Sequence, residues 1–246
     1  MAMRAFITAA LACTAMPAMA QDFGSVDAAG LYVPPQGCTL QLTVQSNRCR
    51  VSQHYTCAGD APGDQHTVYF DREGMSYHSR IDTETRWMES HYLRDGVTEW
   101  LDEGSADHAS FSELLETGRD DMDFIIRDNR GARMRYVGFD ELPGTMVEID
   151  GEPLMTTRFE LTATLEDGTF VMSRRGEQFI SRDMRRFFGG RESGRDWTGA
   201  DIKSDDTPRT FRREGQEGFA LTRPQFGCDE MVSDAVLAPA PHKTNA

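Results

Sequence analysis

Long apolar segments are absent from this sequence of 246 residues. The longest apolar run extends from Ala5 to Ala15, whereas a helix needs roughly 20 apolar residues to cross a bilayer. We therefore expect no transmembrane segment. Lysine is also scarce, and the formal net charge of the chain is -14 at pH 7. Because so acidic a chain repels polyanions, nucleic acid and anionic membrane surfaces are poor partners.

The signatures of common catalytic and binding sites are missing as well. The sequence contains no Gly-x-Ser-x-Gly elbow, no His-Glu-x-x-His helix, and no phosphate or calcium loop. Its cysteines lack the paired spacing of a zinc knuckle. We therefore predict no catalytic residues, no cofactor and no metal site. Whether the protein is an enzyme stays open, with a non-enzymatic role favoured.

The N-terminus has the order of residues that is typical of a secretory signal. Arg4 precedes the apolar run, and Ala18-Met19-Ala20 then provides small residues at the cleavage positions. We expect cleavage before Gln21 and export to the periplasm or the medium. The alternative is lipid attachment at Cys13, which would leave a very short apolar region ahead of that cysteine.

The chain that remains after cleavage has the length of one domain. We expect residues 21–228 to form a single β-rich domain. Residues 229–246 contain the run Ala238-Pro239-Ala240-Pro241 and few residues able to pack into a core. We expect this tail to be disordered.

Short segments of alternating apolar and polar residues dominate the domain and predict half-buried strands. The clearest is Phe159 to Leu165, which the Asp167-Gly168 step turns into a second strand over Thr169 to Ser173. Aspartate and glycine suit such tight turns because both tolerate positive φ. Similar turn signals recur at Glu73-Gly74, Asp95-Gly96, Asn129-Arg130-Gly131, Asp150-Gly151 and Arg175-Gly176. So many hairpins in series predict an antiparallel meander.

One segment breaks the β pattern and predicts a helix over residues 107–117. Ser110 and Glu113 have the spacing of a capping box, and Gly118 suits the C-terminus. A helix of three turns cannot cover the apolar side of about ten strands, so the sheet must curl or split into two layers. The predicted fold class is mostly β: an antiparallel meander forming a half-barrel, a barrel or a sandwich with one main α-helix.

The hairpin Tyr92 to Trp100 resembles a hairpin of the periplasmic lipoprotein-carrier half-barrels. A helix embedded in a long meander is also similar, and the likeness covers about residues 65–190. The apolar helices that line the concave face of those carriers have no counterpart here. The resemblance implies a half-barrel that carries a lipid or lipid-modified ligand. The chain is also similar to exported proteins of marine bacteria, which implies no activity.

The apolar face of the clearest hairpin is the predicted ligand-binding surface. An apolar or amphipathic small molecule or lipid would contact the side chains of Phe159, Leu161, Phe170 and Met172. We rank an exported binding or carrier protein first, an envelope structural or interaction protein without a small-molecule site second, and an unrecognised hydrolase third. A filled core separates the second class from the first, because a carrier needs a cavity.

Histidines and acidic residues supply weaker candidates for a metal site. A hairpin through Asp71 to Gly74 would bring two of the four strand histidines together, and these four are His54, His66, His78 and His91. Partly exposed spacers are the favoured interpretation of the histidines. Acidic steps occur at Asp120, Asp121 and Asp123 and at Asp205 and Asp206, where solvated surface is favoured over calcium binding.

A locally basic and aromatic segment runs from Arg182 to Gly190 in this acidic chain. Its arginines suit an anionic head group or a carboxylate ligand. The favoured alternative places its aromatic residues in the core and pairs its arginines with the surplus acids.

Four cysteines follow the signal, and an even number in an oxidising compartment indicates two disulfides. Residues 38–57 read as one hairpin that turns near Ser46-Asn47, which places Cys38 opposite residues 55–57 and Cys49 beside the turn. We therefore predict the pairs Cys38–Cys57 and Cys49–Cys228. If the segment is not a simple hairpin, the main rival joins Cys38 to Cys49 and Cys57 to Cys228.

Overall fold

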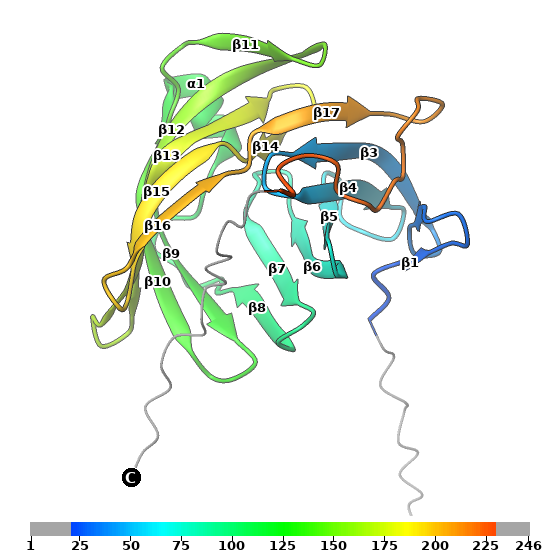
Figure 1. Ribbon diagram of the computed structural model, residues 1–246. Helices are drawn as coiled ribbons and strands as arrows, with labels where there is room; N and C mark the ends of the chain where they lie inside the picture. Colours follow the sequence, from blue (N-terminus) through cyan, green and yellow to red (C-terminus); the bar gives the residue numbers. More distant parts are fainter. Residues whose placement is uncertain (1–20, 230–246) are drawn as a thin grey trace, which may run out of the picture.

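The structure is a computed structural model that describes residues 21–229, and strands dominate it (Figure 1). A small two-stranded sheet contains β1 (Ser25–Val26) and β2 (Tyr32–Val33). All other strands of the described residues belong to one antiparallel sheet. They are β3 (Cys38–Ser46), β4 (Arg50–Cys57), β5 (Gln65–Asp71), β6 (Gly74–Ile81), β7 (Trp87–Tyr92), β8 (Val97–Leu101), β9 (Arg119–Asp128), β10 (Arg133–Glu141), β11 (Met146–Ile149), β12 (Glu152–Leu165), β13 (Phe170–Ser181), β14 (Arg186–Phe188), β15 (Arg191–Asp196), β16 (Asp201–Asp205) and β17 (Pro208–Arg212).

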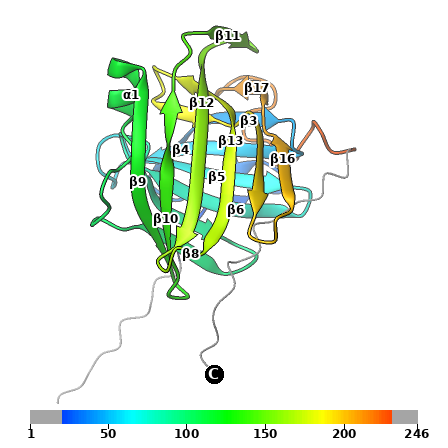
Figure 2. The same ribbon diagram turned by 90° about the vertical axis from the view of Figure 1, so that its left-hand side faces the viewer.

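The large sheet is a curled meander that does not close into a barrel. Its order is β16-β15-β13-β12-β10-β9-β8-β7-β6-β5-β4-β3-β17, with β11 beside β12 and β14 beside β13. The curl produces two walls that face each other: a first wall of β3 to β8 and a second wall of β9, β10, β12, β13, β15 and β16 (Figures 1 and 2). The predicted fold class, a mostly β meander with one main helix, is confirmed.

Apolar clusters hold the two walls together at one end of the molecule. Leu42 on β3 packs with Leu154 on β12, and Phe188 meets Phe211 edge to face with ring centroids 5.1 Å apart. The helix α1 (Phe111–Thr117) adds Phe111 to a second cluster at this end. Because aromatic and aliphatic side chains fill this end, the space between the walls is closed there.

The helix is shorter than the sequence predicts. Ser110 is the N-cap and its hydroxyl accepts a hydrogen bond from the amide of Glu113 at 3.2 Å, while Gly118 ends the helix with a φ of 84°. The predicted start at residue 107 is wrong, because Asp107 forms a β-bridge with Asp123 and extends the chain before the cap. No helix of the described residues is long and apolar enough to cross a membrane.

Five of the six turns predicted from the sequence connect neighbouring strands. They lie at residues 73–74, 95–96, 129–131, 150–151 and 167–168. The sixth prediction is wrong, because Arg175-Gly176 lies inside β13. A β-carbon on Gly176 would lie 2.1 Å from the carbonyl oxygen of Arg191 on β15. Glycine here permits close approach of two strands in a strongly curved sheet and makes no turn.

Both predicted disulfides are confirmed. Cys38 and Cys57 are paired across β3 and β4 with Cα atoms 3.9 Å apart, and the register shifts once between Leu40 and Leu42. Cys49 lies in the turn between β3 and β4 and is joined to Cys228, with a Cα separation of 4.6 Å. The second disulfide ties the C-terminal part of the described chain to the first wall.

Terminal segments cover the outer side of the first wall. Tyr32 packs against Val51, Val68 and Phe70. The amide of Ala220 donates to the hydroxyl of Thr43 at 2.8 Å. The first wall is therefore covered on its outer side and faces the second wall with its inner side. The predicted signal, its cleavage site and all but the first residue of the predicted tail lie outside the described residues.

Candidate functional site: the cavity between the walls

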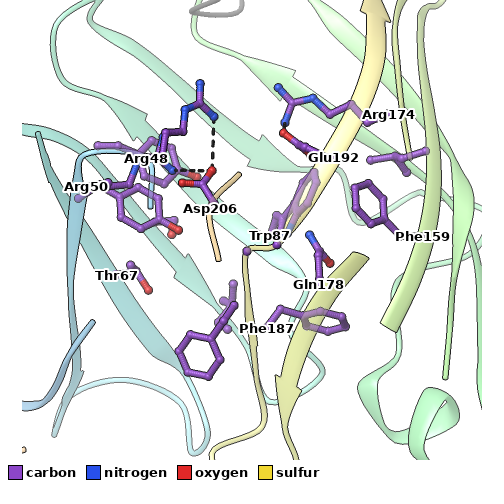
Figure 3. A pocket seen from close by; sticks show the side chains of 18 of the residues that line it. Arg48, Arg50, Thr67, Trp87, Phe159, Arg174, Gln178, Phe187, Glu192 and Asp206 are labelled. Carbon is purple, nitrogen blue, oxygen red and sulfur yellow. Dashed lines mark hydrogen bonds and ion pairs between the residues drawn. The ribbon is translucent and has the colours of Figure 1, made fainter. Parts of the chain in front are cut away.

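A cavity of about 990 Å³ lies between the two walls (Figure 3). Both walls contribute side chains to its lining, including Thr67 and Trp87 from the first and Phe159 and Arg174 from the second. Small-molecule sites typically measure roughly 300 to 1,000 Å³, so this volume accommodates a sizeable ligand.

One side of the cavity is apolar. Phe159 and Leu161 alternate along β12, and Met172 lies beside them on β13. Phe159 and Met172 are almost fully buried, whereas Trp87 is 48% exposed and meets the ring of Phe124 edge to face. Three of the four predicted ligand-binding residues therefore line the cavity. The exposed ring of Trp87 lies where the cavity opens to solvent.

Phe170 is the exception, and its assignment to this surface is a wrong prediction. The register of β12 and β13 shifts so that Ala163 pairs with Met172 but Thr164 pairs with Phe170. The resulting bulge places one extra residue, Val171, between them and reverses the alternation. Phe170 therefore belongs to the opposite face of the sheet, where 39% of it is exposed.

Arginines gather on the other side of the cavity. Arg48 and Arg50 share the carboxylate of Asp206, with N to O distances of 3.4 and 3.5 Å (Figure 3). The guanidinium of Arg50 also lies over the ring of Tyr69, 4.7 Å from its centroid. Asp206 reaches this position because it sits at the corner between the two edge strands, β16 and β17.

The side chain of Arg186 extends through the interior from the second wall to the first wall. It lies on β14, but its guanidinium donates to the side chains of Gln65 and Thr67 on β5 and contacts the ring of His54 on β4. Arg186 is only 4% exposed. Burial lowers the pKa of Arg186 to about 10, so the group stays positively charged at neutral pH. Burial, and then the charge of Arg186, hold the pKa of His54 well below 6.5 and keep this ring neutral.

Two carboxyl groups form a pair at the end of the cavity nearest the helix. Asp120 on β9 and Asp140 on β10 are direct neighbours across the strands, and Asp140 lines the cavity. Burial and the charge of Asp120 raise the pKa of Asp140 to about 7, and burial raises the pKa of Asp120 to about 6. The backbone amide of Ser110 donates to Asp120 at 2.9 Å. At neutral pH the pair is therefore partly protonated.

Three of the four histidines lie away from the cavity. The nitrogens Nδ1 of His66 and Nε2 of His78 are 3.1 Å apart, as the predicted hairpin requires. His91 lies beside His78, and the ring of Phe23 contacts both imidazoles at a tilt. Burial, and then its histidine neighbours, lower the pKa of His78 to about 3.

Residues with metal-ligand chemistry meet at one place in the described part of the chain. Cys57, Asp60 and His66 lie within 4.8 Å of one another. Cys57 is committed to a disulfide and supplies no thiolate, so two ligands remain. This arrangement gives no support to a metal centre, for which three or more protein ligands are usual.

The acidic steps and the basic segment are divided between surface and interior. Asp121 pairs with Arg119 at 2.6 Å, Asp123 is hydrogen-bonded to Arg135 at 2.7 Å, and the third acid of that step belongs to the buried pair described above. In the basic segment, Arg185 pairs with Glu84 at 2.9 Å, and the two phenylalanines after Arg186 join the apolar clusters. The favoured interpretation places the aromatic residues in the core and pairs the arginines with acids. It holds for Arg185 and for both phenylalanines but not for Arg186.

The fold and the cavity define a mostly β protein whose open, curved antiparallel sheet surrounds a space large enough for a small molecule. Comparison with family models, with curated proteins and with solved structures found no match.

Proposed function

We propose that this protein is an exported carrier that binds an amphipathic small molecule between its two walls. The observation that carries the proposal is the cavity of about 990 Å³ with an apolar side at Phe159, Leu161 and Met172 and a polar side that contains Arg50 and Arg186. Such a division favours a ligand with an apolar body and a polar end, because each part then meets its own chemistry.

The unfilled interior distinguishes a carrier from a structural protein. The cores of folded proteins are packed to crystal density and contain few voids larger than a water molecule. Here Phe159 and Met172 are buried by their neighbours in the second wall, yet they line open space toward the first wall. An open space of this size supports a carrier over a structural protein.

Export is part of the same proposal. Two disulfides are typical of an oxidising compartment, and the N-terminal sequence has the pattern of a cleaved signal. The resemblance to the lipoprotein-carrier half-barrels agrees with a carrier role in the periplasm. Cleavage before Gln21 places the whole described domain in that compartment.

Binding of a fluorescent fatty acid tests the proposal. We expect wild-type protein to bind cis-parinaric acid and Leu161→Trp, which fills the apolar side, to bind it at least about tenfold more weakly. Val137→Trp is the matched control, because Val137 is 45% exposed on the outer face of the neighbouring strand and should leave binding unchanged. Absence of binding by wild-type protein, or equal binding by both variants, would argue against the cavity as the site.

A further inference from the structure

We propose that the ligand carries an anionic head group and that Arg186 binds it. This inference rests on the proposed function, because it specifies which amphipathic molecules the cavity selects. It also differs from that function in its prediction, since a cavity for neutral lipids would leave Arg186 unused.

The position of Arg186 places a charge inside the fold. Its guanidinium donates to the side-chain oxygen of Gln65 at 2.8 Å and to the hydroxyl of Thr67 at 3.0 Å. These contacts hold the guanidinium against the first wall. The backbone of Arg186 lies on β14, which pairs with β13 of the second wall. Nη2 donates to Gln65 as well and Nη1 contacts His54, so one Nη2 hydrogen and the positive charge are left to bind an anion.

Arg186 lacks the counter-charge that Arg50 and Arg174 have. Arg174 pairs with Glu192 at 3.2 Å, and Arg50 is an ion-pair partner of Asp206. No carboxylate between residues 21 and 229 lies within ion-pair distance of Arg186, whose polar partners are the neutral side chains of Gln65, Thr67 and His54. A buried charge is normally paired, so an anion from outside the chain completes this site.

The chemistry of the site sets the class of ligand. Carboxylate and phosphate groups both accept a charge-assisted hydrogen bond from a guanidinium, so either suits the head group. The chain as a whole carries a charge of -14, which repels anions from its surface. In this proposal the buried charge of Arg186, which no carboxylate of the described residues offsets, attracts the head group, and the tail of the ligand extends along Phe159 and Leu161.

A series of single-chain ligands with one tail length tests the head group. Decanoate, decyl phosphate, decanol and decyltrimethylammonium are compared by isothermal titration and by displacement of cis-parinaric acid from wild-type protein. We expect decanoate or decyl phosphate to bind at least about tenfold more tightly than decanol, and the cation to bind most weakly. The tighter of the two anions tells whether the natural head group is a carboxylate or a phosphate.

Variants then attribute the preference to one side chain. Arg186→Gln should abolish the preference for anions, whereas Arg186→Lys should retain part of it. Arg185→Gln is the matched control, because it removes the same charge from a neighbour that pairs with Glu84 and does not line the cavity. It should leave the preference intact.

The outcomes separate the two proposals. If decanol binds as tightly as the anions, the head-group inference is overturned while the carrier function stands. If none of the four ligands binds, the carrier function is overturned and the inference with it. Should Arg186→Gln not fold, the comparison of decanol with the anions on wild-type protein decides the question alone.

Discussion

The Asp140→Asn variant will be more stable than wild-type protein at about pH 8, by roughly 1 to 3 kcal/mol, and the difference will vanish near pH 4. The reason is the position of Asp140 inside the cavity beside Asp120, where ionisation costs free energy. Asparagine has nearly the same shape and stays neutral at every pH. The variant therefore removes the cost of ionisation and keeps the packing.

The sign of the effect follows from proton binding. The pKa of Asp140 is raised from its ordinary 3.8 to about 7 in the folded protein, so the folded state binds more protons than the unfolded state between those values. The stability that Asp140 contributes is then fully present below about pH 4 and is lost as the pH rises toward 7. Asp120, with its pKa raised to about 6, adds a shift of the same sign.

Urea denaturation of both proteins at several pH values between 4 and 8 measures the difference. Asp123→Asn on the neighbouring strand β9 is a suitable control, because hydrogen bonds from Arg135 hold the pKa of Asp123 below its ordinary value. That variant should be slightly less stable than wild-type protein at pH 8. A stability gain for Asp123→Asn, or none for Asp140→Asn, would contradict the assignment of the buried acid.

Removing the disulfide between Cys49 and Cys228 will lower the free energy of unfolding by about 4 to 5 kcal/mol, because the bond closes a very long loop in the unfolded chain. The two cysteines are 179 residues apart in sequence. The bond also anchors the segment that contains Ala220 to the outer side of the first wall. We expect the Cys49→Ser, Cys228→Ser protein to become sensitive to proteolysis in that segment.

The disulfide between Cys38 and Cys57 is the natural comparison. Cys38 and Cys57 are only 19 residues apart, so their replacement by serine should cost about 3 kcal/mol. Both double variants are measured by urea denaturation under non-reducing conditions. A larger loss for the Cys38 and Cys57 pair than for the Cys49 and Cys228 pair would show that loop closure is not the main source of stability.

Local features of the chain predict much of the fold. Turn residues such as Asp167-Gly168 act through their own backbone preferences, so they identify hairpins without knowledge of the rest of the molecule. The disulfides follow from one hairpin register, since a cysteine opposite Cys38 leaves Cys49 with a single partner. The glycine of Arg175-Gly176 misleads for the opposite reason, because its role depends on a strand that comes later in the chain.

The binding site is only partly predictable. Phe159, Leu161 and Met172 follow from alternation, but the bulge that excludes Phe170 adds one residue without a distinctive signal in the sequence. Asp140 acquires its raised pKa from burial and from Asp120, which the curl of the sheet provides. The sequence identifies Arg186 only as one arginine of the basic segment from Arg182 to Gly190. Its lack of a counter-charge depends on strands more than one hundred residues away in sequence.

Native mass spectrometry of the protein purified from the compartment to which it is exported tests the carrier role most directly. We expect the folded protein to carry one additional mass that belongs to an anionic amphiphile, and we expect this mass to be lost on denaturation. After delipidation, added decanoate should restore a complex with one bound molecule. A protein that is bare when isolated and that binds neither decanoate nor decyl phosphate would contradict a carrier role for the cavity.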